Sequence, residues 1–143
     1  MLKDSDQTSQ TKFVAPVSVT ETKFFEDFNR SYERHYNVRK IREEHLQVPV
    51  SRCTLDCQLP LAYRHLNIEV DGPHHFWLWY RQKDKRRDWF IGEIMKNRIY
   101  RVPYFLLDDP DWRPYTVDLA VYLTRLIEQQ DINELFEDVP GII

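Results

Sequence analysis

The strongest constraint on the fold is a pair of short β-like runs in which apolar and polar side chains alternate. Residues 53–59 read CTLDCQL, and residues 64–72 read RHLNIEVDG before a Gly-Pro turn. Alternation with a period of two puts one set of side chains on a core and the other set on the opposite face of a sheet. The two runs therefore predict a β-hairpin. Residues 45–62 as a whole predict one strand, or two strands bent at Pro49.

Helical spacing is present on both sides of this hairpin. Residues 18–36 carry an aromatic stripe, and Ser18 or Thr20 can cap the first turn. Residues 82–98 have the pattern of an amphipathic helix, and residues 115–130 predict a further strong helix. The apolar side of the first helix is Phe24, Phe25, Phe28 and Tyr32, and that of the second is Phe90, Ile91, Ile94 and Met95.

The remaining segments complete an α/β fold. Residues 99–107 predict a third strand, a turn-rich loop follows, and residues 131–139 predict a short terminal helix. The expected order is α-β-β-α-β-α, a small mixed central β-sheet flanked by helices. We expect residues 1–17 to form a flexible N-terminal lead and residues 18–143 a single domain, since 143 residues suffice to bury one core.

Composition and charge exclude several classes of protein. No apolar run approaches the roughly 18 residues needed to cross a bilayer, and the first residues lack the apolar segment of a signal peptide. We therefore expect a cytoplasmic protein that does not enter a membrane. The net charge of −3 argues against a basic nucleic-acid coat, yet residues 81–101 carry a local charge of +5 and residues 108–143 one of −7. The basic segment suits a polyanionic ligand, although a solvated helix face is the commoner origin of such a run.

Three carboxylates share the polar faces of the two β-like runs. Asp56 lies in the first run, and Glu69 and Asp71 lie in the second. If the apolar faces pack on one core, these carboxylates converge, and they then repel one another unless a cation or basic groups lie between them. Carboxylate oxygens suit Mg²⁺ or Mn²⁺. The pattern therefore predicts a metal site formed by Asp56, Glu69 and Asp71.

Further candidates lie just after the Gly-Pro turn. His75 suits metal binding, phosphate binding or proton transfer near neutral pH, with a scaffold role as an even alternative. The first turn of the next helix directs Asp84 and Arg87 towards the sheet. Lys83 and Lys85 add positive charge there, and these four helix residues are candidates for nucleic-acid binding.

These motifs carry a resemblance to a known group of enzymes. The phrase IEVDGPHHF, with an Asp in the preceding strand and DKRRDWFIGEIMKNRIYRVPYF after it, resembles the PD-(D/E)XK nuclease superfamily. The chain is most similar to the branch that contains the very-short-patch-repair-like endonuclease domains and the RAP domain. The resemblance covers residues 18–107. It implies a restriction-endonuclease-like fold and a metal-dependent endonuclease that hydrolyses phosphodiester bonds in DNA or RNA.

By position, the resemblance implies metal ligands at Asp56 and Glu69 and the first-helix acid at Glu21. A metal held there would lower the pKa of a bound water, and Arg87 would hold the scissile phosphate. The other matched positions are His75 after the turn and Asp84 and Arg87 as the D-x-x-R of the helix.

The chain departs from the superfamily at Asp71, which stands where a water-activating lysine is often found. Lys83, Lys85 or His75 are possible substitutes. RAP-type members share this departure, so the alternatives are a non-catalytic RAP-type RNA-binding module and a protein-interaction domain that docks through the acidic C-terminal helices. A nuclease of this size would need a homodimer or a protein partner to acquire sequence specificity.

Overall fold

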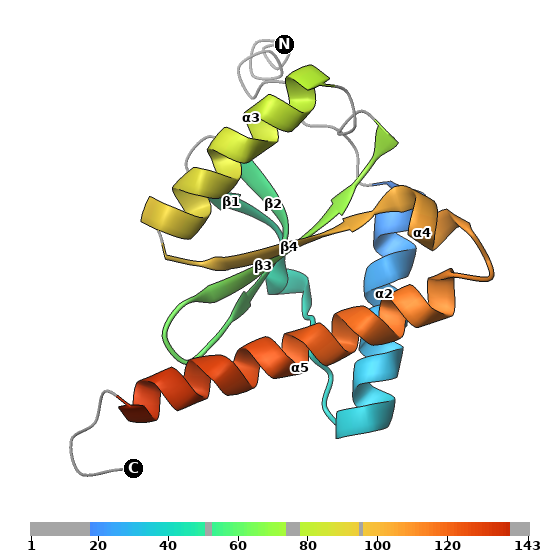
Figure 1. The fold of residues 1–143 in the computed structure, drawn as a ribbon. Helices are drawn as coiled ribbons and strands as arrows, with labels where there is room; N and C mark the ends of the chain where they lie inside the picture. Colours follow the sequence, from blue (N-terminus) through green and yellow to red (C-terminus); the bar gives the residue numbers. More distant parts are fainter. Residues whose placement is uncertain (1–17, 51–52, 74–77, 95, 138–143) are drawn as a thin grey trace, which may run out of the picture.

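The protein is an α/β domain with one four-stranded mixed sheet. The structure, a computed structural model, describes residues 18–50, 53–73, 78–94 and 96–137 (Figure 1). The helices are α2 (Val19–Tyr36), α3 (Leu78–Trp89), α4 (Tyr104–Asp108) and α5 (Arg113–Glu137), with a 3-10 turn at Glu43–His45 and a π-helical turn at Phe90–Ile94. The strands are β1 (Leu46–Val50), β2 (Cys53–Pro60), β3 (His65–Asp71) and β4 (Arg98–Pro103).

The strands follow one another across the sheet in the order β1-β2-β3-β4. Neighbours β1, β2 and β3 are antiparallel, whereas β4 pairs with β3 in parallel after the crossover through α3. The predicted α/β class, the mixed sheet and the β2–β3 hairpin are confirmed. The expected order contained one strand too few, because residues 45–62 contain two strands, β1 and β2. The alternative of two strands is confirmed, but the predicted bend at Pro49 is wrong, since Pro49 lies within β1 and pairs with Thr54.

The core lies between the sheet and the helices α2 and α5, while α3 covers the other face (Figure 1). The Ser18 side chain accepts a hydrogen bond from the Glu21 backbone at 3.0 Å, and Asn37 ends α2 with a left-handed φ of 59°. Both caps satisfy backbone groups that a helix end leaves unpaired. The predicted aromatic stripe of α2 is buried at the centre of this core, together with Leu59, Leu66 and Ile68.

Several boundaries differ from the expectation. The helix predicted over residues 82–98 begins earlier, at Leu78, its described part ends at Ile94, and Arg98 already belongs to β4. The predicted strand at 99–107 ends at Pro103, which has no N–H to continue a ladder, and α4 follows. The predicted break before Asp131 is absent, because this side chain is fully buried inside α5 and accepts a hydrogen bond from the Tyr63 backbone at 2.6 Å. In the helix after β3, Ile91 is buried but Phe90 is exposed, since the π-helical turn is wider than the assumed 3.6-residue period.

Across the described ranges, no helix combines the length and the apolar character needed to span a membrane.

Candidate functional site

The candidate site lies where β2 and β3 part. Their backbone ladder joins Pro60 to His65 and continues to the pair of Cys57 and Ile68. At the next residues along the two strands, carboxylate side chains accept the hydrogen bonds from the backbone of the opposite strand. The Asp56 backbone N–H donates to Glu69 Oε2 at 3.0 Å, and the Val70 N–H donates to Asp56 Oδ2 at 2.8 Å. Each carboxylate is thereby fixed by a backbone donor of the neighbouring strand.

Glu69 is a buried carboxylate with a single arginine beside it. It is 3% exposed, and its Oε1 lies 2.6 Å from Nη2 of Arg87, which comes from α3. Arg87 Nη2 also donates to the Thr54 carbonyl at 3.3 Å. Burial and the charge of Asp56 raise the pKa of Glu69 above its usual range, and the Arg87 guanidinium opposes this shift. The structure thus brings together Asp56, Glu69 and Arg87 from three different elements.

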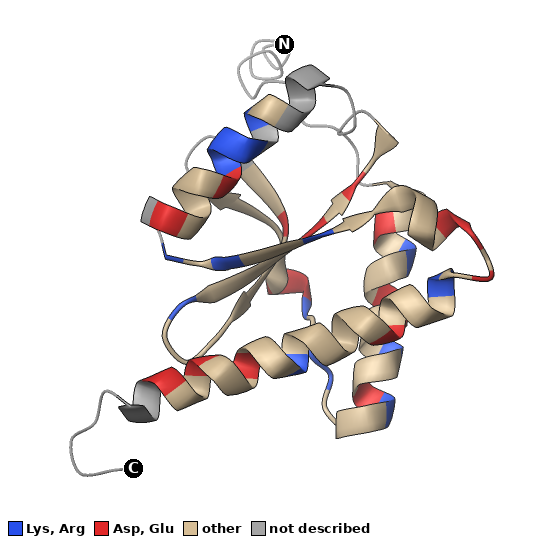
Figure 2. Ribbon diagram, viewed as in Figure 1, with Lys and Arg blue, Asp and Glu red and all other residues tan. Residues whose placement is uncertain are grey.

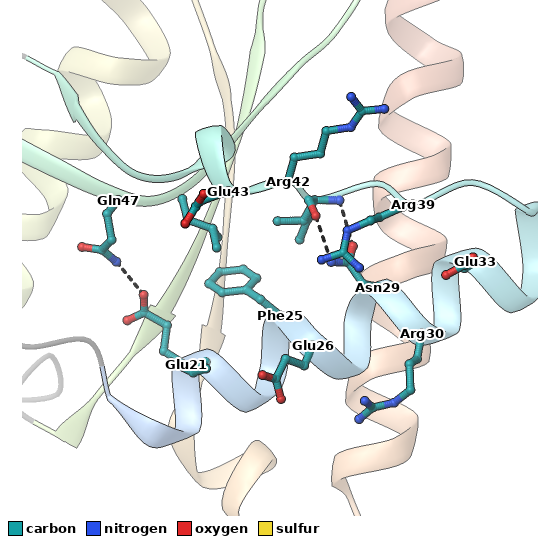
Figure 3. Close-up of a pocket in the computed structure, with 13 residues that line it drawn as sticks. Glu21, Phe25, Glu26, Asn29, Arg30, Glu33, Arg39, Arg42, Glu43 and Gln47 are labelled. Carbon is teal, nitrogen blue, oxygen red and sulfur yellow. Dashed lines mark hydrogen bonds between the residues drawn. The ribbon is translucent and has the colours of Figure 1, made fainter.

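Glu21 approaches the same place from the first turn of α2. Gln47 Nε2 donates to its Oε2 at 2.7 Å (Figure 3). Burial and the charge of Asp56 raise the pKa of Glu21 to about 7, although the hydrogen bond from Gln47 lowers it. A carboxyl that titrates near neutral pH, held next to another carboxylate, is typical of sites that move protons.

Gln47 is a site residue that the sequence did not reveal. It has a φ of 50°, a left-handed conformation that is uncommon for a residue with a side chain. The ladder between β1 and β2 places it opposite Asp56. Such local strain often accompanies functional sites, and here it accompanies the hydrogen bond to Glu21. Its one sequence signal is a polar residue between Leu46 and Val48.

Asp71 belongs to a different cluster. Its Oδ1 lies 2.6 Å from Arg101 Nη1, and the same guanidinium binds Asp88 through two hydrogen bonds of 2.9 and 2.6 Å. In the described ranges, no three His, Cys, Asp or Glu side chains are placed to hold one metal ion. The expected convergence of Asp56, Glu69 and Asp71 is therefore not found, because Arg101 neutralises Asp71 and holds it with Asp88.

The remaining predicted residues lie in α3 or outside the described part of the chain. His75 lies outside the described residues, and Asp84 lies in α3 without a described side chain. Lys83 and Lys85 are exposed on α3. In Figure 2, α3 carries a run of basic residues, while the charged residues of α5 are mainly acidic.

A cavity of about 520 Å³ opens beside Glu21, between α2 and residues 39–47 (Figure 3). Asn29 fixes the far wall, because its side chain accepts from the Ile41 N–H at 2.8 Å and donates to the Ile41 carbonyl at 2.9 Å. The cavity has an apolar floor of Phe25, Ile41 and Leu46 and a rim of mixed charge that includes Arg39, Arg42, Glu26 and Glu43.

Fold and site together define an α/β domain with a carboxylate pair set into a strand junction and an arginine against it. No protein-family model, no curated protein and no solved structure matches the chain. The functional proposal below therefore relies on the residues of this chain.

Proposed function

We propose that the protein is a metal-dependent nuclease of the PD-(D/E)XK type that hydrolyses phosphodiester bonds in DNA or RNA. The observation that carries the proposal is the pair formed by Asp56 and Glu69. Backbone donors fix both carboxylates where two strands part, and Arg87 lies in direct contact with Glu69. Fixed carboxylates beside a positive group suit the positioning of a phosphodiester.

The carboxylate pair fits Mg²⁺ or Mn²⁺, which prefer oxygen ligands. Asp56 raises the pKa of Glu69, so the two carboxylates repel each other, and a divalent cation beside them would remove that repulsion. Asp56 and Glu69 would hold the ion, whereas Asp71 is already neutralised by Arg101. A bound ion supplies a water of lowered pKa and neutralises charge on the phosphate.

The chain itself supplies two further functions. Arg87, which lies 2.6 Å from Glu69, would donate to a phosphate oxygen, a charge-assisted bond that would strengthen as negative charge develops on the phosphate. Glu21, with a pKa raised to about 7, is partly ionised near neutral pH and can accept a proton from the attacking water. Glu21 would thereby take the role of the lysine that the superfamily often has at the position of Asp71.

A second candidate is a non-catalytic nucleic-acid-binding module of RAP type. It is favoured by one specific observation: the carboxylates of Asp56 and Glu69 already serve as hydrogen-bond acceptors for backbone groups and for Arg87. In this alternative they stabilise the strand junction and have no part in chemistry.

Cleavage of labelled single-stranded and duplex DNA and RNA, with Mg²⁺ or Mn²⁺, separates the two candidates. We expect cleavage that a chelator abolishes and that Glu69→Gln slows by about 100-fold or more, while nucleic-acid binding persists. Glu44→Gln is the matched control, because Glu44 is exposed and lies outside the site. Binding without cleavage under every condition would favour the RAP-type module. Absence of binding even at low salt, where phosphate contacts are strongest, would overturn both.

A further inference from the structure

Helix α5 is apolar on two sides, and the fold uses only one of them. Its inner side packs into the core through Val117, Ala120 and Val121. Its outer side, together with the residue directly before the helix, exposes a stripe of large side chains that are between 40% and 71% exposed. We call this the α5 stripe; its members are Trp112, Tyr115, Leu119, Tyr122 and Leu126.

The spacing of the α5 stripe matches that of a helix seam. Successive members are three, four, three and four residues apart, the alternation that keeps apolar side chains on one line facing another helix. Trp112 precedes α5 directly and packs edge-on against Tyr115, with ring centroids 6.4 Å apart. Exposed aromatic residues clustered in this way are typical of interface anchors.

Two charged residues of opposite sign flank the α5 stripe on one side. Asp118 directly precedes Leu119, and Arg125 directly precedes Leu126, so the two occupy equivalent flanking positions one heptad apart. Each side chain is 53% exposed. Each also has a contact with α2: Asp118 Oδ1 accepts from Ser31 Oγ at 2.8 Å, and Arg125 lies 4.6 Å from the ring centre of Tyr36.

This charge pattern is complementary to itself in one orientation only. In an antiparallel pair of α5 helices, with Leu119 of one copy opposite Tyr122 of the other, Asp118 of each copy faces Arg125 of the other. In a parallel pair the corresponding positions opposite them are Leu123 and Gln130, so neither charge meets an opposite charge on the second helix. Within its own chain, Asp118 Oδ1 lies 3.8 Å from Arg34 Nη2, and Arg125 Nη1 lies 3.9 Å from Glu128 Oε1. A two-fold interface requires such self-complementarity.

We infer that the α5 stripe binds a second copy of this chain, with the two α5 helices antiparallel about a two-fold axis. Helix α5 lies on the side of the sheet opposite α3 (Figure 1), and Arg87 of α3 contacts Glu69, so we expect the Glu69 site to stay uncovered in the dimer. The inference does not depend on the nuclease proposal, since it uses none of the site residues.

Sedimentation equilibrium over a wide range of protein concentration tests the dimer. We expect the wild type to dimerise, and Leu119→Glu to weaken the dimer by about 100-fold, because it places a charge in the centre of the apolar seam. Val38→Glu is the matched control, since Val38 is 52% exposed and lies outside α5. Thermal melts of each variant confirm that the fold is intact.

A charge exchange tests the orientation and the identity of the partner. Asp118→Arg and Arg125→Asp should each weaken the dimer, and the double variant should restore it. A protein that stays monomeric at every concentration overturns the proposal, as does a dimer that Leu119→Glu leaves unchanged. Failure of the double variant to restore dimerisation overturns the antiparallel pairing. A monomer that Leu119→Glu destabilises would assign the α5 stripe to a segment of the same chain, which also overturns the proposal.

Discussion

The two faces of the sheet differ in kind, and β3 contributes to both. Towards α2 and α5 it presents Leu66, Ile68 and Val70, which belong to a continuous apolar core. On the alternate positions it presents Asn67, Glu69 and Asp71, and α3 supplies Arg87 and Asp88 as partners of this polar face. Because strand side chains alternate, one seven-residue strand separates the groups that stabilise the fold from the groups available for chemistry.

The contrast extends to unsatisfied polar groups. Asn67 is fully buried on the polar face, and its amide has no hydrogen-bond partner in the part of the chain that the structure describes. Buried polar groups nearly always have a hydrogen-bond partner, so an unpartnered buried amide such as that of Asn67 needs an explanation other than stability. Substitutions on the two faces should therefore differ in effect: on the apolar face they should strongly lower stability, whereas a conservative substitution of Glu69 on the polar face should change stability little.

The largest expected effect on stability is from the apolar face. Phe28 is fully buried, with its ring centre 5.9 Å from that of Tyr32. Phe28→Ala should lower the free energy of unfolding by about 3–5 kcal/mol in urea denaturation. Glu69→Gln, measured alongside it, should cost no more than about 1 kcal/mol, because glutamine keeps a hydrogen-bonding oxygen and lacks the charge that burial disfavours. Equal losses for the two variants would contradict the division between the faces.

A pH-dependent effect of similar size is expected from Glu21. Its pKa is raised from 4.5 to about 7 in the folded protein, so the native state holds the proton more tightly than the unfolded state. The stabilising contribution of this one group is fully present below pH 4.5 and is lost as the pH rises to about 7. At about 1.4 kcal/mol per pKa unit the loss is at most about 3 kcal/mol, and solvent screening of this carboxyl lowers it. Glu21→Gln should remove this part of the decline. Chemical denaturation at several pH values measures the free energy of unfolding of the wild type and of Glu21→Gln. If this free energy changes with pH in the same way for both proteins, the pKa of Glu21 is not raised.

A smaller effect is expected from the cluster around Arg101. This guanidinium pairs with Asp71 and Asp88, and Arg101→Met would leave two neighbouring carboxylates without it. We expect a loss of about 2 kcal/mol in the free energy of unfolding, since the groups are only partly buried. Arg98→Met on the same strand is the control, because its hydrogen bond to Gln130 is exposed. Similar losses for both variants would show that the cluster adds nothing specific.

Much of the fold follows from local patterns. The N-cap and aromatic stripe of α2 and the alternation in β2 and β3 are properties of neighbouring residues, and the structure places them as predicted. The same alternation placed Asp56 and Glu69 on one face. What connects those two residues, a pair of hydrogen bonds from backbone N–H groups to carboxylates, depends on where the strands part, which no local pattern encodes.

Two features of the site, the separation of Asp71 from Glu69 and the presence of Gln47, depend on pairing between neighbouring strands. Asp71 is two residues from Glu69 on β3 and so lies on the same face of the strand. Its partner, however, is Arg101 from the parallel neighbour β4, thirty residues away. Gln47 acquires its left-handed backbone opposite Asp56, although glutamine has no preference for that conformation. The register between strands therefore decided which acids share a site.

The most direct test of the central claim is calorimetric titration of Mg²⁺ and Mn²⁺ into the wild type, Asp56→Asn and Asp71→Asn. Asparagine keeps an oxygen that can accept from the Val70 N–H, so the strand junction should persist in Asp56→Asn. The account predicts that the wild type and Asp71→Asn bind a divalent ion with similar affinity, and that Asp56→Asn binds at least about 10-fold more weakly. Absence of binding to the wild type, or equal binding to Asp56→Asn, would contradict the assignment of Asp56 and Glu69 as the metal site.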